Sequence, residues 1–216
     1  MELTPPCLQT CPGLDLAFFK AHQNFPDGGT ILEFGVGGGF SYSWMSWWIK
    51  NKYTKDHLIG FDSWQGLPKE TKGVWFPDCH KEGNYLHEKN VVYSKAKSLG
   101  VDIAKDPRFE FVDGFFDKAL TLELQGRIKN VILINMDVDL HSSATLVLSW
   151  VTSLLQTGTV IYTDDWHFPM LGVDPELECG ASLAFKQWGL SNPEIKLETL
   201  KVFPNSQRYF EVQLLG

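Results

Sequence analysis

The stretch Ile31-Leu32-Glu33-Phe34-Gly35-Val36-Gly37-Gly38-Gly39-Phe40 decides the fold. The apolar residues 30–35 predict a buried strand that ends in glycine, and the aromatic-rich residues 41–50 predict the helix that follows. The glycines between them let the backbone turn sharply and let a ligand approach it. A strand, a glycine turn and a helix in this order predict a nucleotide-binding loop.

Two cofactor classes compete for this loop. The dinucleotide pattern G-x-G-x-x-G fits Gly35 and Gly37 but needs a third glycine where the chain has Phe40. The alternative pattern is an acidic residue followed by glycines at every second position. The chain fills that pattern with Glu33, Gly35, Gly37 and Gly39. In this respect the loop resembles the glycine motif of class I methyltransferases, and we expect S-adenosylmethionine (SAM) as the cofactor.

The rest of the chain alternates predicted strands and helices, which indicates a mostly parallel sheet covered on both faces. Strands are expected at 30–35, 57–62, 109–112, 130–137, 159–163, about 195–203 and 208–215. Helices are expected at 13–24, 41–50, 85–99, 116–124, 142–155 and 178–188. The expected fold is therefore α/β, the Rossmann-like class I methyltransferase fold, with a seven-stranded, mostly parallel sheet and a C-terminal antiparallel hairpin.

Length and charge limit the remaining alternatives. The 216 residues fit one methyltransferase domain, with an N-terminal segment at 1–28 and candidate substrate or lid loops at 69–85 and 166–178. The net charge of -7 argues against a nucleic-acid partner and suits a small-molecule substrate or a bound cation. No signal peptide or membrane span is expected, so the predicted location is cytoplasmic, without a membrane partner. The oligomeric state stays open, with a homo-oligomer among the alternatives.

An acidic residue closes the second predicted strand. Asp62 follows the apolar residues 58–61 and lies 23 residues after Gly39. A carboxylate at this place can accept hydrogen bonds from both hydroxyls of a ribose. SAM and NAD both carry such a ribose, so Asp62 supports a nucleoside cofactor without choosing between them.

Four aspartates end two strands that should be neighbours. Asp137 and Asp139 follow one strand, and Asp164 and Asp165 follow the next. Ligands bind outside the carboxyl ends of parallel strands, and carboxylates gathered there repel one another unless a cation lies between them. Mg²⁺ is the expected ion. It would orient and acidify a hydroxyl group while the free carboxylate of Asp139 takes the proton. The alternative is that some of these aspartates cap helices or lie in solvent.

Three segments together resemble the metal-dependent sugar O-methyltransferases of natural-product biosynthesis, typified by macrocin O-methyltransferase. They are residues 60–68 (GFDSWQGLP), 111–116 (FVDGFF), and 136–140 (MDVDL) with 164–166 (DDW). The resemblance covers about residues 29–190, and F-D-S-W-x-G-L-P is its most specific part. It implies SAM-dependent, Mg²⁺-assisted methylation of a hydroxyl on a small sugar-like or polyhydroxylated molecule.

The resemblance also implies residue roles. The metal ligands would be Asp137, Asp164 and Asp165. The general base would be Asp139. Independently of the resemblance, His167 follows the D-D-W run and is a second candidate catalytic residue. The residues expected to bind the cofactor are Glu33, Gly35, Gly37, Gly39, Phe40, Ser41, Asp62, Ser63, Asp113, Gly114 and Asp137. Of these, Asp113 and Gly114 would lie near the adenine.

Some positions depart from the family pattern. His141 and Ser142 stand where the family has a tyrosine and an acidic residue, and we expect His141 to be a surface histidine. The insert at 73–85 has no counterpart. Cys7 and Cys11 could join Cys79 and His80 in a zinc site, although free thiols are the preferred interpretation.

Two alternatives to a methyltransferase stay open. The first is a non-catalytic or differently specialised SAM-binding protein of the same fold. The second is an NAD-dependent oxidoreductase, which is disfavoured by Phe40 and by the lack of a Tyr-x-x-x-Lys pair at a suitable place.

Overall fold

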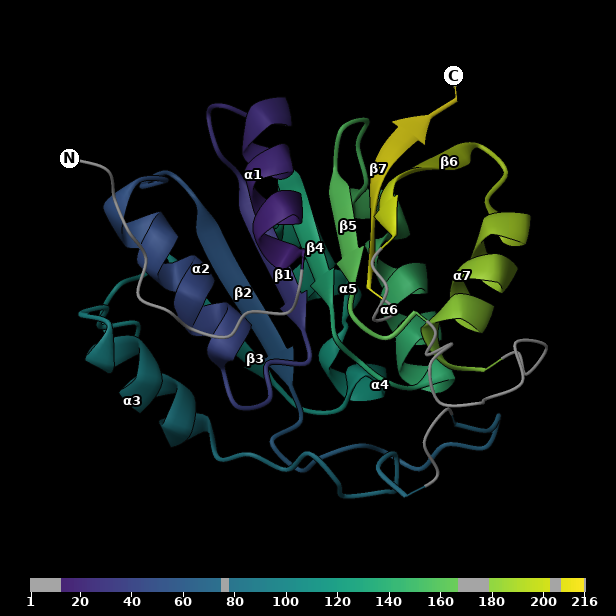
Figure 1. Ribbon diagram of the computed structural model, residues 1–216, viewed down its shortest axis with the longest axis horizontal. Coiled ribbons are helices and arrows are strands. Elements are labelled where there is room, and N and C mark those ends of the chain that lie inside the picture. Colours follow the sequence, from purple (N-terminus) through teal and green to yellow (C-terminus); the bar gives the residue numbers. More distant parts are fainter. Residues whose placement is uncertain (1–12, 75–77, 167–178, 203–206, 216) are drawn as a thin grey trace.

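The computed structural model describes residues 13–74, 78–166, 179–202 and 207–215. These residues form one seven-stranded sheet in the order β3-β2-β1-β4-β5-β7-β6 (Figure 1). Its strands are β1 (Thr30–Phe34), β2 (His57–Asp62), β3 (Phe109–Asp113), β4 (Val131–Met136), β5 (Val160–Thr163), β6 (Ile195–Val202) and β7 (Arg208–Leu214). The first five strands are parallel, and β7 lies antiparallel between β5 and β6. The predicted fold class is confirmed, including the closing antiparallel hairpin.

Helices cover both faces of the sheet (Figure 1). They are α1 (Leu14–Asn24), α2 (Phe40–Asn51), α3 (Lys89–Ser98), α4 (Phe116–Ala119), α5 (Leu122–Arg127), α6 (His141–Val151), the 3₁₀ turn η1 (Thr152–Leu154) and α7 (Gly180–Ser191). One core cluster joins α1, α2 and α3 to the sheet, and the other joins α5, α6 and α7 to the opposite face. Successive side chains of β1 point to opposite faces of the sheet, since Ile31 belongs to one cluster and Leu32 to the other.

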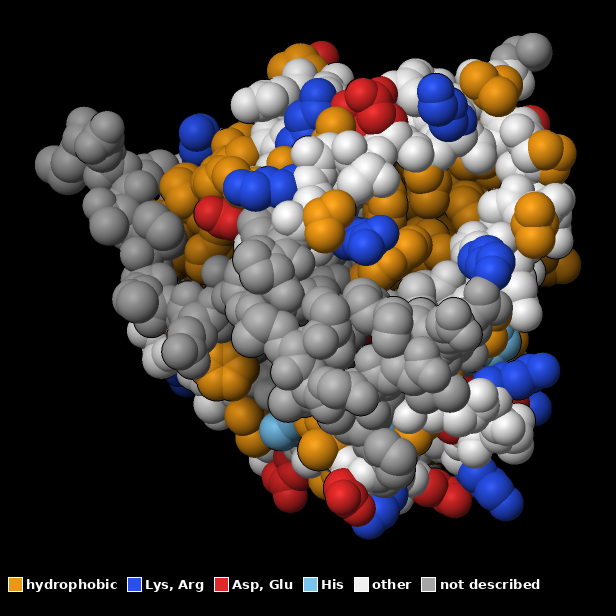
Figure 2. Space-filling model, turned by 45° about the vertical axis from the view of Figure 1, so that its right-hand side comes forward, with side chains coloured by type: hydrophobic (Ala, Val, Ile, Leu, Met, Phe, Trp, Pro, Cys, Tyr) orange, Lys and Arg blue, Asp and Glu red, His pale blue; other side chains and the backbone are white. Residues whose placement is uncertain are grey.

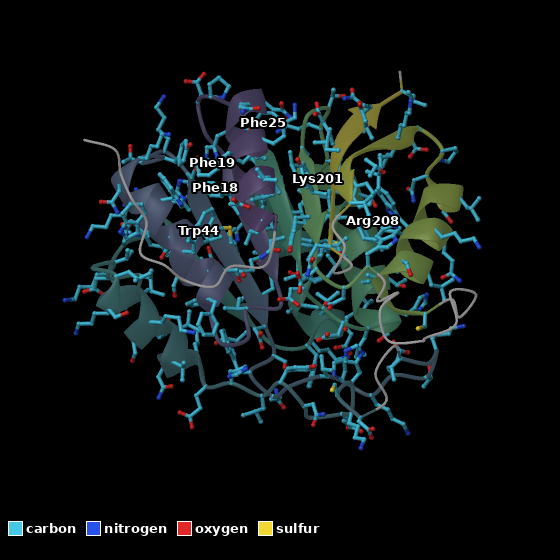
Figure 3. All side chains as sticks on the ribbon, in the orientation of Figure 1. Phe18, Phe19, Phe25, Trp44, Lys201 and Arg208 are labelled. Atoms are coloured by element: carbon cyan, nitrogen blue, oxygen red, sulfur yellow. The ribbon has the colours of Figure 1, made fainter. Side chains whose placement is uncertain are left out.

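Aromatic rings connect the first two helices. The ring of Trp44 in α2 lies 5.2 Å from that of Phe18 and 6.2 Å from that of Phe19, both edge-on, and Figure 3 labels this group. Trp44 and Trp48 are buried, as a core role predicts. The aromatic stripe of α2 therefore packs as core and fixes the helix that begins at the glycine loop.

Two predicted helices differ in their limits. The helix expected at 85–99 begins at Lys89, because the backbone is left-handed at Tyr85, with a φ of 59°, and extended at Glu88. The helix expected at 116–124 is divided into α4 and α5, because the hydroxyl of Thr121 accepts a hydrogen bond from the backbone N–H of Leu124. Both differences arise from local backbone geometry that hydrophobic periodicity does not report.

The outer surface of the C-terminal half carries both hydrophobic and basic side chains. Figure 2 shows the side that carries α7 and the β6–β7 hairpin, where hydrophobic side chains reach the surface between Lys and Arg side chains. None of the described helices combines the length and apolarity needed to cross a bilayer. Cys7, Cys11 and His167 lie outside the described residues.

Candidate active site

The glycine loop joins the carboxyl end of β1 to α2, and its backbone requires glycine at two points. Gly35 has a φ of 83°, and a Cβ there would lie 1.7 Å from the carbonyl oxygen of Asp137. Gly39 has a φ of 72°, and a Cβ there would lie 2.6 Å from a methyl carbon of Val92. The loop therefore passes close to β4 and α3, in a conformation that other residues rarely adopt.

Asp62 fixes this loop from the end of β2. Its Oδ2 accepts hydrogen bonds from the backbone N–H groups of Val36 and Gly37, at 2.9 and 2.8 Å. Its Oδ1 accepts from the backbone N–H of Trp64 at 2.8 Å. The carboxylate thus lies in the wall of a cavity that opens beside the glycine loop, at the position where a ribose is expected.

Glu33 is buried beneath the loop and does not line the cavity. One of its carboxyl oxygens accepts hydrogen bonds from the Ser41 hydroxyl and from Asn135 Nδ2, and the other has no partner among the described residues. Burial raises the pKa of Glu33 to about 8. Through these two hydrogen bonds the Glu33 carboxyl group connects Ser41, in the first turn of α2, to β4. Since Glu33 does not line the cavity, it can affect a bound cofactor only through Ser41.

Asp113 and Gly114 face different ways. Asp113 Oδ1 accepts hydrogen bonds from Trp64 Nε1 at 2.8 Å and from Lys89 Nζ at 2.7 Å, and Asp113 does not line the cavity. Gly114 lines it together with Phe115 and Phe116.

The aspartates of β4 and β5 meet, as predicted from their strand ends. Asp137, Asp164 and Asp165 each offer one carboxylate oxygen, and these oxygens lie within 4.8 Å of one another. Burial, followed by repulsion from the neighbouring aspartates, raises the pKa of Asp137 and of Asp165 well above the usual value. A partly buried group of carboxylates needs either protons or a cation to offset its charge.

Asp139 lies beside this cluster and is held from two sides. Its backbone is left-handed, with a φ of 56°, and its N–H donates to Asp165 Oδ2 at 3.3 Å. Its own Oδ1 lies 3.2 Å from Nε2 of His80, a side chain that is only 2% exposed. Asp139 lines the cavity, whereas His80 stands behind it. His80 was expected only as a possible zinc ligand with Cys7, Cys11 and Cys79, and no sequence pattern connects it to Asp139.

The segment that carries His80 crosses the carboxyl edge of the sheet. The described parts of this β2–α3 loop (residues 63–74 and 78–88) lie beneath the strand ends, between β2 and α3 (Figure 1). Backbone hydrogen bonds of 2.9 Å join Leu67 to Asn84 and Gly83 to Leu67 at its stem. Farther out, Glu70 Oε2 accepts a hydrogen bond of 2.8 Å from the backbone N–H of Ser142, in the first turn of α6. The loop therefore connects the cofactor side of the sheet to α6.

Tyr85 belongs to the segment 69–85 that was expected to be a substrate or lid loop, but no role was predicted for it individually. It lines the cavity with a half-exposed ring. Burial, followed by the charge of Asp139, raises the pKa of its hydroxyl to about 12. His141, expected at the surface, is buried instead, because α6 packs on α7 and its Nε2 lies 2.9 Å from Gln187 Oε1.

A cavity of about 600 Å³ joins these parts. The predicted cofactor residues that line it are Gly35, Gly37, Gly39, Phe40, Ser41, Asp62, Ser63, Gly114 and Asp137. The three predicted metal ligands and Asp139 line it as well. Glycine loop and carboxylate cluster thus open into one space, of a size usual for small-molecule sites.

Several solved structures that match this fold are methyltransferases. The calicheamicin methyltransferase CalS11 matches with a TM-score of 0.71 and 18% identity, over 92% of this chain and 77% of that one. The O-methyltransferase NovP matches with a TM-score of 0.69 and 16% identity, over 92% and 78%. An O-methyltransferase from Bacillus cereus, in complex with SAH, matches with a TM-score of 0.56 and 14% identity, over 98% and 84%.

At these identities the likeness concerns the fold. The chain has the class I methyltransferase fold, and the resemblance noted in the sequence is confirmed at that level. No protein-family model matches the chain, and no curated protein matches it in sequence.

Proposed function

We propose that the protein is a SAM-dependent O-methyltransferase that uses Mg²⁺ to methylate a hydroxyl of a small polyhydroxylated molecule. One observation carries the proposal: the glycine loop and the carboxylate cluster line the same cavity. The expected binding sites for the cofactor and the cation therefore lie in one cavity. This arrangement suits a reaction between an electrophilic methyl group and an oxygen held by a metal.

The cofactor end of the cavity suits SAM. Asp62 is fixed by three backbone N–H groups at the expected ribose position. Gly114, Phe115 and Phe116 form an apolar wall on the side of β3, where the adenine is expected. The backbone at Gly35 has no room for a side chain. The solved methyltransferases of the same fold support this choice, since the Bacillus cereus protein was solved in complex with SAH.

The other end suits a divalent cation. Three carboxylate oxygens lie within 4.8 Å of one another and could each ligate one Mg²⁺ ion, which would take its remaining ligands from water and substrate. The raised pKa values of Asp137 and Asp165 support a bound cation, because Mg²⁺ would replace the protons that those two groups otherwise retain.

When bound, SAM supplies an electrophilic methyl group, and Mg²⁺ supplies positive charge beside the acceptor oxygen. The residues of this chain orient the reactants and accept the proton. Asp139 would accept the proton of the acceptor hydroxyl, while SAM, when bound, would supply the methyl group and leave as SAH. His167 remains a second candidate for contact with the acceptor.

Calorimetric titration of the protein with SAH and, separately, with NAD tests the cofactor assignment. We expect SAH to bind and NAD not to bind. Tight NAD binding without SAH binding would overturn the proposal in favour of an oxidoreductase. The reaction is tested with tritium-labelled SAM and a panel of vicinal diols, both sugars and catechols. SAH binding without methyl transfer to any acceptor would favour a non-catalytic SAM-binding protein.

A further inference from the structure

The charges around the cavity indicate what kind of acceptor it takes. We propose that the acceptor carries a net positive charge, as in a vicinal diol that also bears a protonated amine. This inference rests on the proposed function, from which the cofactor, the cation and the diol are taken. It adds the charge of the substrate, which the fold does not determine.

The lining of the cavity is strongly acidic. Six of its residues are aspartates: Asp62, Asp117, Asp137, Asp139, Asp164 and Asp165. Among the described lining residues there is no lysine or arginine, and the one basic side chain is His87. The His87 ring lies over Gly37 and Gly38, at the cofactor end. The acceptor end therefore has negative charge without a positive side chain of its own.

Three cations on the neighbouring elements have partners of their own. Lys89 contacts the carboxylate of Asp113 at 2.7 Å. Lys95 donates to the carbonyl oxygen of Gly38 at 2.6 Å and lies over the Phe40 ring. The guanidinium of Arg208, labelled in Figure 3, lies 4.6 Å from the centre of the Trp166 ring. None of these three cations lines the cavity.

The segments outside the described residues do not offset the excess of acidic side chains around the cavity with lysine or arginine. By sequence, residues 1–12, 75–77, 167–178 and 203–206 contain no lysine or arginine, and their one histidine is His167. Residues 167–178 add three acidic residues, which are Asp174, Glu176 and Glu178. Wherever these segments lie, they supply no lysine or arginine to pair with an anionic substrate.

The bound reactants offset only part of the negative charge. Mg²⁺ brings two positive charges and SAM a net one, against the six carboxylates of the lining. The remaining negative potential attracts a cation and repels an anion such as a sugar diphosphate. Tyr85 presents a half-exposed ring at the same end of the cavity, which gives an ammonium group a π face beside the carboxylates.

Three catechols with the same vicinal oxygens test the proposal: dopamine, 4-methylcatechol and 3,4-dihydroxybenzoate, which are cationic, neutral and anionic at pH 7. Each is titrated calorimetrically into the protein with Mg²⁺, with and without saturating SAH. We expect dopamine to bind most tightly and 3,4-dihydroxybenzoate at least about tenfold more weakly, a difference that shrinks as salt is added.

Substitution of a lining residue adds a second test. Leu146 of α6 lines the cavity and is 41% exposed, so L146K adds a positive charge at low risk to folding. We expect L146K to weaken dopamine binding and to strengthen 3,4-dihydroxybenzoate binding, each by roughly five- to tenfold. L146Q controls for side-chain length. L122K, at a site 80% exposed and outside the cavity, controls for net charge.

The outcomes separate this inference from the proposed function. Failure of SAH to bind would contradict the cofactor assignment, while the SAH-free titrations would still give the charge order. SAH binding together with equal or tighter binding of the anion would overturn the inference and leave the proposed function standing. Failure of all three catechols to bind, or an equal effect of L122K and L146K, would also overturn it.

Discussion

His80 Nε2 lies 3.2 Å from Asp139 Oδ1, and this contact connects the β2–α3 loop to the carboxyl end of β4. The imidazole is almost entirely buried, whereas the carboxylate lines the cavity. Asp139 also has a left-handed backbone, which such a residue keeps only where its surroundings hold it. His80 is therefore a positioning residue for the proposed base.

Replacement of His80 should lower the rate of methyl transfer without affecting the cofactor site. We expect H80A to reduce kcat roughly 10- to 100-fold, with an unchanged Kd for SAH, because the carboxylate of Asp139 loses its orienting partner. H80Q keeps a donor for that carboxylate and should recover part of the rate. Steady-state kinetics with the best acceptor of the diol panel gives kcat and KM separately. If H80A and H80Q lose activity equally, or if only KM rises, His80 does not act through Asp139.

Removal of the metal should stop the reaction and destabilise the cluster. We expect EDTA to abolish methyl transfer and added Mg²⁺ to restore it. We also expect Mg²⁺ to raise the Tm of the wild type, because it offsets the repulsion among Asp137, Asp164 and Asp165. D165N should raise the Tm of the metal-free protein and lose most of the response to Mg²⁺. Scanning calorimetry with and without the ion measures both, and full activity after EDTA treatment would argue against a catalytic metal.

Glu33 makes stability depend on pH. Its pKa is 4.5 in the unfolded chain and about 8 when folded, so its proton is bound more tightly in the native state. The resulting stabilisation is fully present below pH 4.5 and is lost as the pH rises through about 8. Over this window, E33Q should remove a slope of at most about 1.4 kcal/mol per pH unit, while it keeps an acceptor for Ser41. Urea unfolding at several pH values tests this, and parallel profiles for E33Q and the wild type would contradict it.

Gly35 should tolerate no side chain. G35A forces a left-handed backbone on alanine, at about 1–3 kcal/mol, and directs its Cβ at the carbonyl oxygen of Asp137. We expect a clear loss of stability and of SAH binding. Gly189 of α7 is the matched control, because a Cβ there meets no atom within 4 Å. G189A should stabilise the protein by about 0.5–1 kcal/mol. Normal SAH binding by G35A would show that the glycine loop does not bind the cofactor.

Patterns along the chain predicted much of the fold and part of the site. The strand and helix alternation predicted the sheet, and the topology of a parallel sheet brings Asp137 and Asp164 to one edge because both end strands. The contact between His80 and Asp139 depends on the path of a long loop, which no periodicity records. The orientation of Asp113 depends on Lys89 and Trp64, and the burial of Glu33 depends on Asn135 of another strand.

The two outer attachments of the β2–α3 loop end on neighbouring residues of the chain. Glu70 contacts Ser142 at the start of α6, and His80 contacts Asp139, so both attachments reach the short segment that connects β4 to α6. The stem at Leu67 and Asn84 is fixed separately by backbone hydrogen bonds. A displacement of the loop beyond this stem would therefore disturb the first turn of α6 and the partner of Asp139 together. Substitutions in the loop should for this reason affect the proposed base even where they lie far from the cavity in the sequence.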